Sequence, residues 1–250
     1  MKGEFIAREM LGADEVSEMY ALFSAYFEGV SERRFRADLD EKQWIVRVMR
    51  GRELCGFSSL RITRHVRRGK PLAVVSSGDT IIAPEARSTT LLARTWIEAV
   101  NRLRLIHREP EFVWMLLVSG FRTYRLLPVF WREFYPCYAR ATPANVEDDM
   151  QSVASTLFGA QYSAKDRVVR FEEPQILRAE HAGIPAARCG DPHVDFFASR
   201  NPGHARGDEL VCWTRLSYDN LTEAGMRMWR ASSAALREPR DQPCAPAAAV

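Results

Sequence analysis

The stretch "IIAPEARSTTLL" (residues 81–92) joins an apolar strand pattern to a helical pattern, and this junction decides the fold prediction. The strand pattern runs over 72–83, and Pro84 interrupts the hydrogen-bond ladder at its end. An amphipathic stripe follows, which predicts a helix beginning at Ser88. Because the start of a helix offers unpaired N–H groups and the positive end of its dipole, such a junction can hold a phosphate group.

Hydrophobic periodicity predicts further helices and strands on both sides of this junction. Before it we expect a helix at 14–27, strands at 44–49 and 53–63, a basic loop at 64–70 and a bulge at Gly78. After it we expect a buried strand at 111–120, a short helix at 122–136 kinked at Pro128, a helix at 143–159 and a strand at 166–173.

The composition changes after Pro174, where turn residues become frequent before a short strand and a last helix. We therefore predict a domain at 1–173, an extension at 174–237 that covers the acceptor site, and a disordered tail at 238–250. The order of elements predicts an α/β fold with a mixed, mostly antiparallel sheet flanked by helices.

Composition and charge exclude several classes of protein. With 46% hydrophobic residues the chain can bury a core, and a formal net charge of +3 is too small to indicate nucleic-acid binding. No apolar run approaches the roughly 18 residues of a membrane span, and the start lacks the apolar segment of a secretory signal. Five irregularly spaced cysteines without a C-x2-C pair indicate reduced thiols in the cytoplasm and no metal site.

At the junction the sequence resembles the GNAT acyltransferase superfamily. The central motif of that family runs apolar-x-Pro-Glu-x-Arg-Gly-x-Gly-x-Gly/Ala and is followed by an apolar helix. Here the matching residues are Ile82, Pro84, Glu85 and Arg87, whereas Ser88, Thr90 and Leu92 stand where the motif prefers Gly or Ala. The resemblance covers roughly residues 14–140 and rests on the order of elements as much as on the motif.

The resemblance implies that backbone amides after the arginine hold the pyrophosphate of coenzyme A. Leu92 adds bulk where the family has little, although backbone amides donate whatever the side chain. Branches without the full glycine pattern, similar to N-acyl amino acid synthases and homoserine lactone synthases, take acyl groups from acyl carrier protein. The co-substrate is therefore acyl-CoA or a carrier-borne acyl-pantetheine, and the expected binding residues are Ile82, Ala83, Arg87, Ser88, Thr89, Thr90 and Leu91.

Two residues are candidates for proton transfer. Asp79 lies beside the motif and can take the proton of an attacking amine; the alternative is that it pairs with an arginine or ends a bulge. The family implies a tyrosine after the buried strand that protonates the leaving thiolate. Tyr124 is the expected residue, with Tyr135 or Ser119 as alternatives and aromatic packing as the other explanation.

The predicted function is transfer of an acyl group from a thioester to the amine of a small molecule; the alternative is a GNAT-like binding module without turnover. A loop at 200–209 is an alternative lid over the acceptor pocket. Oligomeric state stays open. Two basic clusters predict either an acidic carrier protein as partner or simply a solvated surface. The first consists of Arg64, Arg67, Arg68 and Lys70, and the second of Arg122, Arg125 and Arg132.

Overall fold

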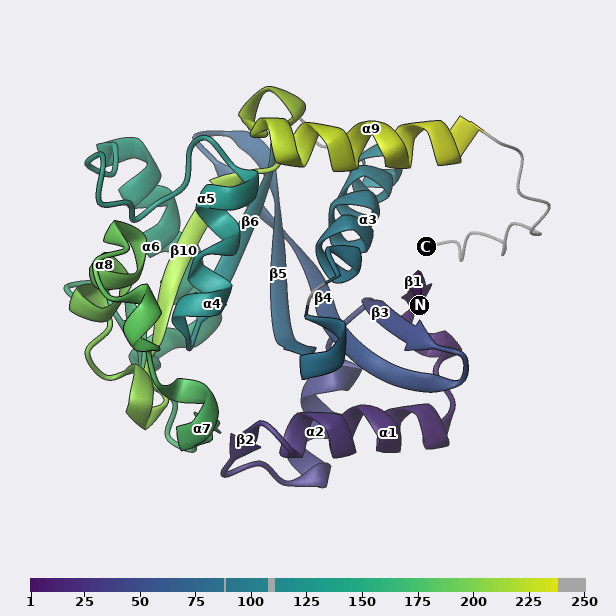
Figure 1. Cartoon of the computed structure of the whole chain (residues 1–250). Coiled ribbons are helices and arrows are strands. Elements are labelled where there is room, and N and C mark those ends of the chain that lie inside the picture. The colour runs from purple at the N-terminus through teal and green to yellow at the C-terminus, as the bar shows by residue number, and fades with distance from the viewer. Residues whose placement is uncertain (88, 108–110, 238–250) are drawn as a thin grey trace.

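The computed structural model describes residues 1–87, 89–107 and 111–237, and within them the strands form one main sheet (Figure 1). Its order is β1-β3-β4-β5-β6-β10-β8-β7. Every neighbouring pair is antiparallel except β5 and β6, which are parallel. The strands are β1 (Lys2–Ala7), β3 (Trp44–Arg50), β4 (Glu53–Arg67), β5 (Lys70–Ile82), β6 (Glu111–Val118), β7 (Tyr162–Ser163), β8 (Val168–Val169) and β10 (Glu209–Arg215).

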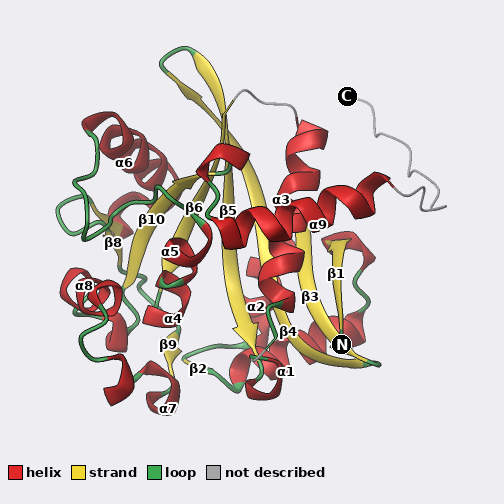
Figure 2. Cartoon of the chain, turned by 45° about the horizontal axis from the view of Figure 1, so that its top comes forward, coloured by secondary structure: helices red, strands yellow, loops and turns green. Residues whose placement is uncertain are grey.

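Helices cover both faces of this sheet (Figures 1 and 2). One face carries α3 (Leu91–His107), α4 (Phe121–Tyr124), α5 (Leu126–Phe130), α8 (Pro192–Arg200) and α9 (Glu223–Arg237). The other carries α1 (Ala13–Ser24), α2 (Glu32–Asp40) and α6 (Ala144–Phe158). A two-stranded sheet of β2 (Phe27–Glu28) and β9 (Ile176–Leu177) lies near α7 (Ala179–Ala182). No helix in the described ranges has the length and apolar character needed to cross a membrane.

The arrangement confirms the predicted fold class, an α/β fold with a mostly antiparallel mixed sheet flanked by helices. The segment 174–237 contributes β10 to this same sheet, between β6 and β8. The chain is thus not divided at residue 173 into a sheet domain and a separate extension. The expected tail at 238–250 lies outside the described residues.

The expected basic loop at 64–70 is instead the end of a long hairpin. β4 continues to Arg67 and β5 starts again at Lys70, with Arg68 and Gly69 between them. Both turn residues have positive φ, 48° and 75°, as a two-residue turn that matches the twist of a hairpin requires. The sequence did not reveal this hairpin because its residues are mostly charged. Strand ends that are exposed on both faces need not show the apolar alternation by which a strand is recognised.

β5 and β6 separate along their length, and this separation positions the site. Their parallel register extends from Leu72–Glu111 to Ser77–Leu116 and no further. β5 then continues to Ile82 alongside β4 alone, with a shift in register that confirms the expected bulge next to Gly78. Asp79 within this bulge has a φ of 46°, a left-handed conformation that Asp adopts more readily than most residues. The two strands therefore form a seam that opens into a wedge.

Candidate active site

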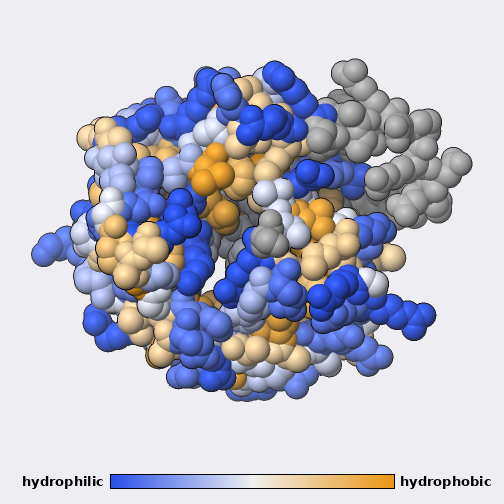
Figure 3. All heavy atoms as spheres, viewed as in Figure 1, coloured by the Kyte–Doolittle hydropathy of each residue, from blue (hydrophilic) through white to orange (hydrophobic). Residues whose placement is uncertain are grey.

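A cavity of about 690 Å³ occupies the wedge between β5 and β6. Its walls come from both strands, the first turn of α3, α4 and α5, and from residues of α2, α7 and β10. Figure 3 shows the surface hollowed near the middle of this view, between the side that carries α8 and the side that carries α1 and α2. The cavity thus reaches helices on both faces of the sheet.

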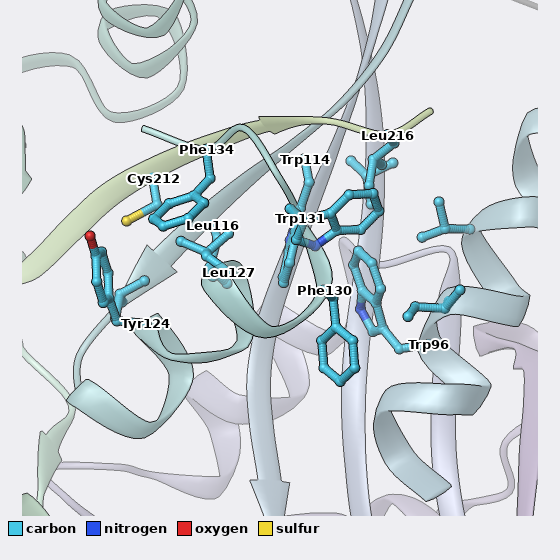
Figure 4. Close-up of a cluster of buried hydrophobic side chains, with 14 of the residues drawn as sticks. Trp96, Trp114, Leu116, Tyr124, Leu127, Phe130, Trp131, Phe134, Cys212 and Leu216 are labelled. Atoms are coloured by element: carbon cyan, nitrogen blue, oxygen red, sulfur yellow. The ribbon is translucent and has the colours of Figure 1, made fainter. Parts of the chain in front are cut away.

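On the α3 and α5 side, the wall of the cavity is aromatic (Figure 4). The rings of Trp96 and Trp114 lie 4.2 Å apart between centroids, and Phe130 and Trp131 complete the wall. The indole Nε1 of Trp114 donates to Ser77 Oγ at 2.8 Å, so the polar atom of this ring is satisfied inside the core. This part of the cavity suits an apolar chain.

The turn before α3 differs from the expected phosphate cradle. A 3₁₀ turn occupies Pro84–Ala86, and α3 begins at Leu91 rather than at Ser88, which lies outside the described residues. The N–H groups of Ala86, Arg87 and Thr89 donate to carbonyls within the turn. The first turn of α3 remains available as a donor, because the first N–H groups of a helix have no partner within it.

Only some of the expected binding residues line the cavity. Ile82, Arg87 and Thr89 line the cavity, as do Leu92 and Ala93 of the first helical turn. Three others do not line it: the N–H of Ala83 donates to the carbonyl of Cys55 at 2.8 Å, Thr90 is exposed, and Leu91 packs against the small cluster of Val48, Cys55 and Ala86.

Two arginines from distant segments meet at one mouth of the cavity. Arg87 lies over the Tyr26 ring at 5.6 Å, and Arg122 Nη1 donates to the His181 carbonyl at 2.6 Å. Burial lowers the pKa of Arg122, and the positive charge of Arg87 lowers it further. The two cations therefore lie near each other. Neither forms an ion pair with a carboxylate in the described part of the chain. Two unpaired cations beside a helix start make a favourable site for an anion.

A group of carboxylates around Asp79 forms another part of the cavity wall. Ser59 Oγ donates to Asp79 Oδ2 at 3.2 Å, while Lys42 Nζ lies 2.9 Å from Asp38 Oδ1. Burial and the negative charge of Asp38 raise the pKa of Asp79 to about 7. A carboxylate with a pKa near neutrality is well matched to accept a proton from an amine.

Glu209 is a site residue that sequence reasoning missed. It is the first residue of β10, points to the same face as Val211, and lines the cavity. Burial raises the pKa of its carboxyl to about 8, with further contributions from the charges of Asp79 and Asp38. The available signal was a single acidic residue at the start of the apolar run "ELVCW".

The structure does not bring Tyr124 to the cavity. Its side chain is fully buried, and its hydroxyl donates to the Pro136 carbonyl at 2.9 Å. Figure 4 shows the hydroxyl on the side of Phe134 and Cys212, away from Phe130. Burial strongly raises its pKa. This is the packing alternative noted for Tyr124; of the two substitutes considered, Ser119 lines the cavity and Tyr135 does not.

The basic hairpin also lies away from the cavity. Arg67 forms ion pairs with Glu111 and Asp149 at the Lys70 end of β5, roughly 20 Å along the strand from the opening after Ser77. In the second basic cluster only Arg122 lines the cavity, since Arg125 pairs with Asp191 and Arg132 is exposed. The hairpin is therefore not part of the mouth.

Fold and site together define an α/β protein with a ligand-sized cavity in a splayed sheet. No family model matches the sequence, and no curated protein matches it either. Solved structures give partial likenesses. A probable N-acyltransferase from Enterococcus faecalis V583 has a TM-score of 0.42 at 17% identity, covering 54% of this chain and 33% of that one. The present chain thus spans about a third of the length of the Enterococcus protein.

Two further structures have similar scores. A GCN5-related N-acetyltransferase from Kribbella flavida has a TM-score of 0.39 at 11% identity over 84% of this chain and 64% of its own. A Trypanosoma brucei acetyltransferase has a TM-score of 0.38 at 14% identity over 57% of this chain and 98% of its own. Likenesses of this size concern the course of the chain and carry no information about substrate.

Proposed function

We propose that this protein is an N-acyltransferase that moves an acyl group from a thioester to the amine of a small molecule. The observation that carries the proposal is the polarity of the cavity between β5 and β6. Two unpaired arginines lie at one mouth beside the start of α3, and carboxylates with raised pKa values line another part of the same cavity. An anionic donor and a cationic acceptor can thus enter one cavity and meet at the seam.

In the proposed arrangement the donor lies along the seam. Its phosphate groups bind to Arg87, Arg122 and the first N–H groups of α3. Its acyl group and thioester lie beside the aromatic wall of Trp96, Trp114 and Trp131. Beyond Ser77 the backbone of β5 has no partner on β6, so its polar groups on that side are available to the thioester carbonyl.

The reaction at the carboxylate end is a direct transfer. The amine nitrogen attacks the thioester carbonyl carbon, forming the C–N bond, and the C–S bond breaks. Asp79 accepts the proton that the amine loses, and the thiolate leaves and takes up a proton from water. Asp79 suits this role because it lies in the bulge where β5 leaves β6 and its pKa is about 7.

The charge at the mouth bears on which carrier presents the acyl group. A carrier protein was expected partly because of the cations at 64–70, and these lie at the far end of β5. The two mouth arginines suit the phosphates of free coenzyme A and equally the single phosphate of a carrier-borne pantetheine. We favour coenzyme A, because its additional phosphates give both arginines a partner.

A second candidate is a binding module that holds an acyl thioester or a partner protein without turnover. One observation favours it: the amides of Ala86, Arg87 and Thr89, which should cradle a phosphate, are engaged within the 3₁₀ turn. Leu92 also contributes bulk to the cavity where the family motif prefers a small residue.

The two candidates differ in whether free thiol appears. The purified protein is incubated with a panel of acyl-CoA species and an amine mixture, and released thiol is followed with a chromogenic thiol reagent. Release that requires both protein and amine, and that is lost in Asp79→Asn, supports transfer. Stoichiometric binding of acyl-CoA by calorimetry without amine-dependent thiol release supports the binding module. The same chain presented on coenzyme A and on acyl carrier protein identifies the donor.

A further inference from the structure

A two-stranded clasp connects the two sides of the wedge. It consists of β2 and β9, which pair in antiparallel register at Phe27–Leu177 and Glu28–Ile176. β2 comes early in the chain, between α1 and α2, whereas β9 comes late and precedes α7 (Figures 1 and 2). Phe27 and Leu177 also line the cavity. The clasp therefore ties the helices that precede β5 to a segment that follows β6.

Arg178 fastens the clasp. Its backbone N–H donates to the Tyr26 carbonyl at 2.9 Å, and its side chain donates from Nε and Nη2 to the Ser24 carbonyl at 3.3 and 3.1 Å. Its Nη1 also lies 3.4 Å from Glu28 Oε1. The N–H of His181 donates in turn to the Arg178 carbonyl at 2.8 Å. Backbone bonds thus hold the segment of His181 against that of Tyr26.

The rings of Tyr26 and His181 stack across the clasp. Their centroids are 4.5 Å apart and their planes differ by 27°, a separation at which aromatic rings attract each other. Tyr26 is buried, and both side chains line the cavity. The stack is therefore a direct side-chain link between two segments that lie far apart in the sequence.

Each member of the stacked pair contacts one of the mouth arginines. The guanidinium carbon of Arg87, which follows β5, lies 5.6 Å from the centroid of the Tyr26 ring, whose face attracts a cation. Arg122, which lies in α4 after β6, donates from Nη1 to the His181 carbonyl at 2.6 Å. The contacts thus form an unbroken series from Arg87 through Tyr26 and His181 to Arg122.

The two arginines indicate that the clasp does more than stabilise the fold. Two guanidinium groups repel each other, and neither forms an ion pair with a carboxylate within the described ranges. Contacts that hold two such groups at one mouth are favourable when an anion binds between them. Arg87 and Arg122 also come from opposite sides of the wedge, so their spacing depends on whatever connects those sides.

We propose that Tyr26 and His181 are positioning residues for the donor, because their stack holds Arg87 and Arg122 where both contact the phosphate groups of one coenzyme A molecule. The inference rests on the proposed acyl transfer and on the donor site described there. In this role neither Tyr26 nor His181 touches the reacting atoms. Loss of the stack should therefore reduce the affinity for the donor and leave the rate at saturating donor unchanged.

Donor binding and closure of the clasp should support each other. A ligand that binds both arginines favours the state in which the stack is formed, and by linkage the stack favours that ligand to the same extent. The amide of Arg178 measures closure, because it donates to the Tyr26 carbonyl across the clasp. Coenzyme A should therefore slow the hydrogen exchange of this amide.

The test is calorimetric binding of coenzyme A to the full chain. His181→Ala removes the stack and keeps the backbone carbonyl that Arg122 uses; it should weaken binding about 10-fold, because the arginines are no longer pre-positioned. His181→Phe retains a ring and should restore the affinity to within about 2-fold of the natural protein. The matched control is Tyr138→Ala. Tyr138 also contacts a histidine, His193, with centroids 4.7 Å apart, but it does not line the cavity and its loss should leave the affinity unchanged.

Steady-state kinetics separate positioning from a general loss of structure. In His181→Ala the KM for acyl-CoA should rise about 10-fold while kcat stays within about 2-fold, whereas partial unfolding lowers kcat through the fraction of active protein. Circular dichroism and urea denaturation check that each variant is folded. If His181→Ala does not fold, exchange of the Arg178 amide in the natural protein, with and without coenzyme A, decides the question.

Three results would overturn the inference: unchanged coenzyme A affinity in folded His181→Ala, a His181→Phe variant that binds as weakly as His181→Ala, or an Arg178 amide that coenzyme A does not slow. Failure of the proposed function has another signature. If His181→Ala weakens coenzyme A binding but the natural protein releases no thiol from any acyl thioester, the positioning role stands and acyl transfer is rejected. A natural protein that binds no coenzyme A also overturns the inference, even where thiol release from acyl carrier protein upholds the transfer.

Discussion

The free energy of unfolding is expected to rise as the pH falls from about 8 to about 5. In the folded chain the pKa of Asp79 is about 7 and that of Glu209 about 8, against ordinary values of 3.8 and 4.5. Between the ordinary and the raised value, the folded state holds a proton that the unfolded state has released. Each group therefore makes the fold less stable as the pH increases through its window.

The size of the effect follows from proton linkage. A difference of one bound proton changes stability by about 1.4 kcal/mol per pH unit, so the two groups together reach roughly 3 kcal/mol per unit between pH 5 and 7. Because both carboxyls face the cavity, screening by solvent weakens this effect, and we expect about half of it. His65 and His193, whose pKa values burial lowers, act in the opposite sense below their ordinary value of 6.5. Glu15, whose pKa the hydrogen bond from Arg47 lowers, does so only below 4.5.

The assay is urea denaturation followed by tryptophan fluorescence, at about one-unit steps from pH 5.5 to 8.5. Asp79→Asn and Glu209→Gln should each remove about half of the slope and should be more stable than the natural protein at the alkaline end. Glu53→Gln should retain the full slope. A denaturation midpoint that stays level or drops as the pH is lowered from 8.5 to 5.5 would refute this account of the carboxylates.

Four further substitutions test the site and its support. Arg87→Ala and Arg122→Ala should each weaken coenzyme A binding about 10-fold by calorimetry, with exposed Arg132→Ala unchanged; equal affinities would remove the mouth from the donor site. Tyr124→Phe should lower the free energy of unfolding by about 1 kcal/mol, since its buried carbonyl partner loses a hydrogen bond, and should leave turnover intact; a drop in turnover of about 100-fold in a stably folded variant would restore the proton-donor role. Ser77→Ala should cost about 1–3 kcal/mol in urea titrations, because the indole N–H above it loses its partner, and a neutral result would contradict that bond.

Much of the fold could be predicted because its signals are local. The apolar runs of β3, β4, β5 and β6 and the stripe of α3 are readable within each segment, and they cover most of the sheet and one wall of the cavity. β1 and α2 were missed. β1 is a short strand of six residues near the N-terminus. In α2 only Phe35 and Leu39 are buried, which is too few to define a helical period.

The site could be predicted only where it is local. Asp79 was predicted because it stands beside the bulge in a strand whose apolar pattern is visible in the sequence. Glu209 was not, because it enters the cavity through the pairing of β10 with β6, a contact between segments far apart in sequence. The side-chain direction of Tyr124 depends on a helix of only four residues. Hydrophobic periodicity cannot predict the orientation of so short a helix, because one turn does not show a repeat.

The parallel ladder of six paired positions between β5 and β6 separates strands that come early in the chain from strands that come late. β1, β3, β4 and β5 all precede α3, whereas β6, β7, β8 and β10 all follow it. The first half consists largely of neighbouring hairpin contacts, which form quickly and can assemble while the remainder is still being synthesised. The second half docks along one short parallel ladder, so the amides of 72–77 should be the best protected from hydrogen exchange at this boundary, and those of 78–82 should exchange through small openings long before the molecule unfolds.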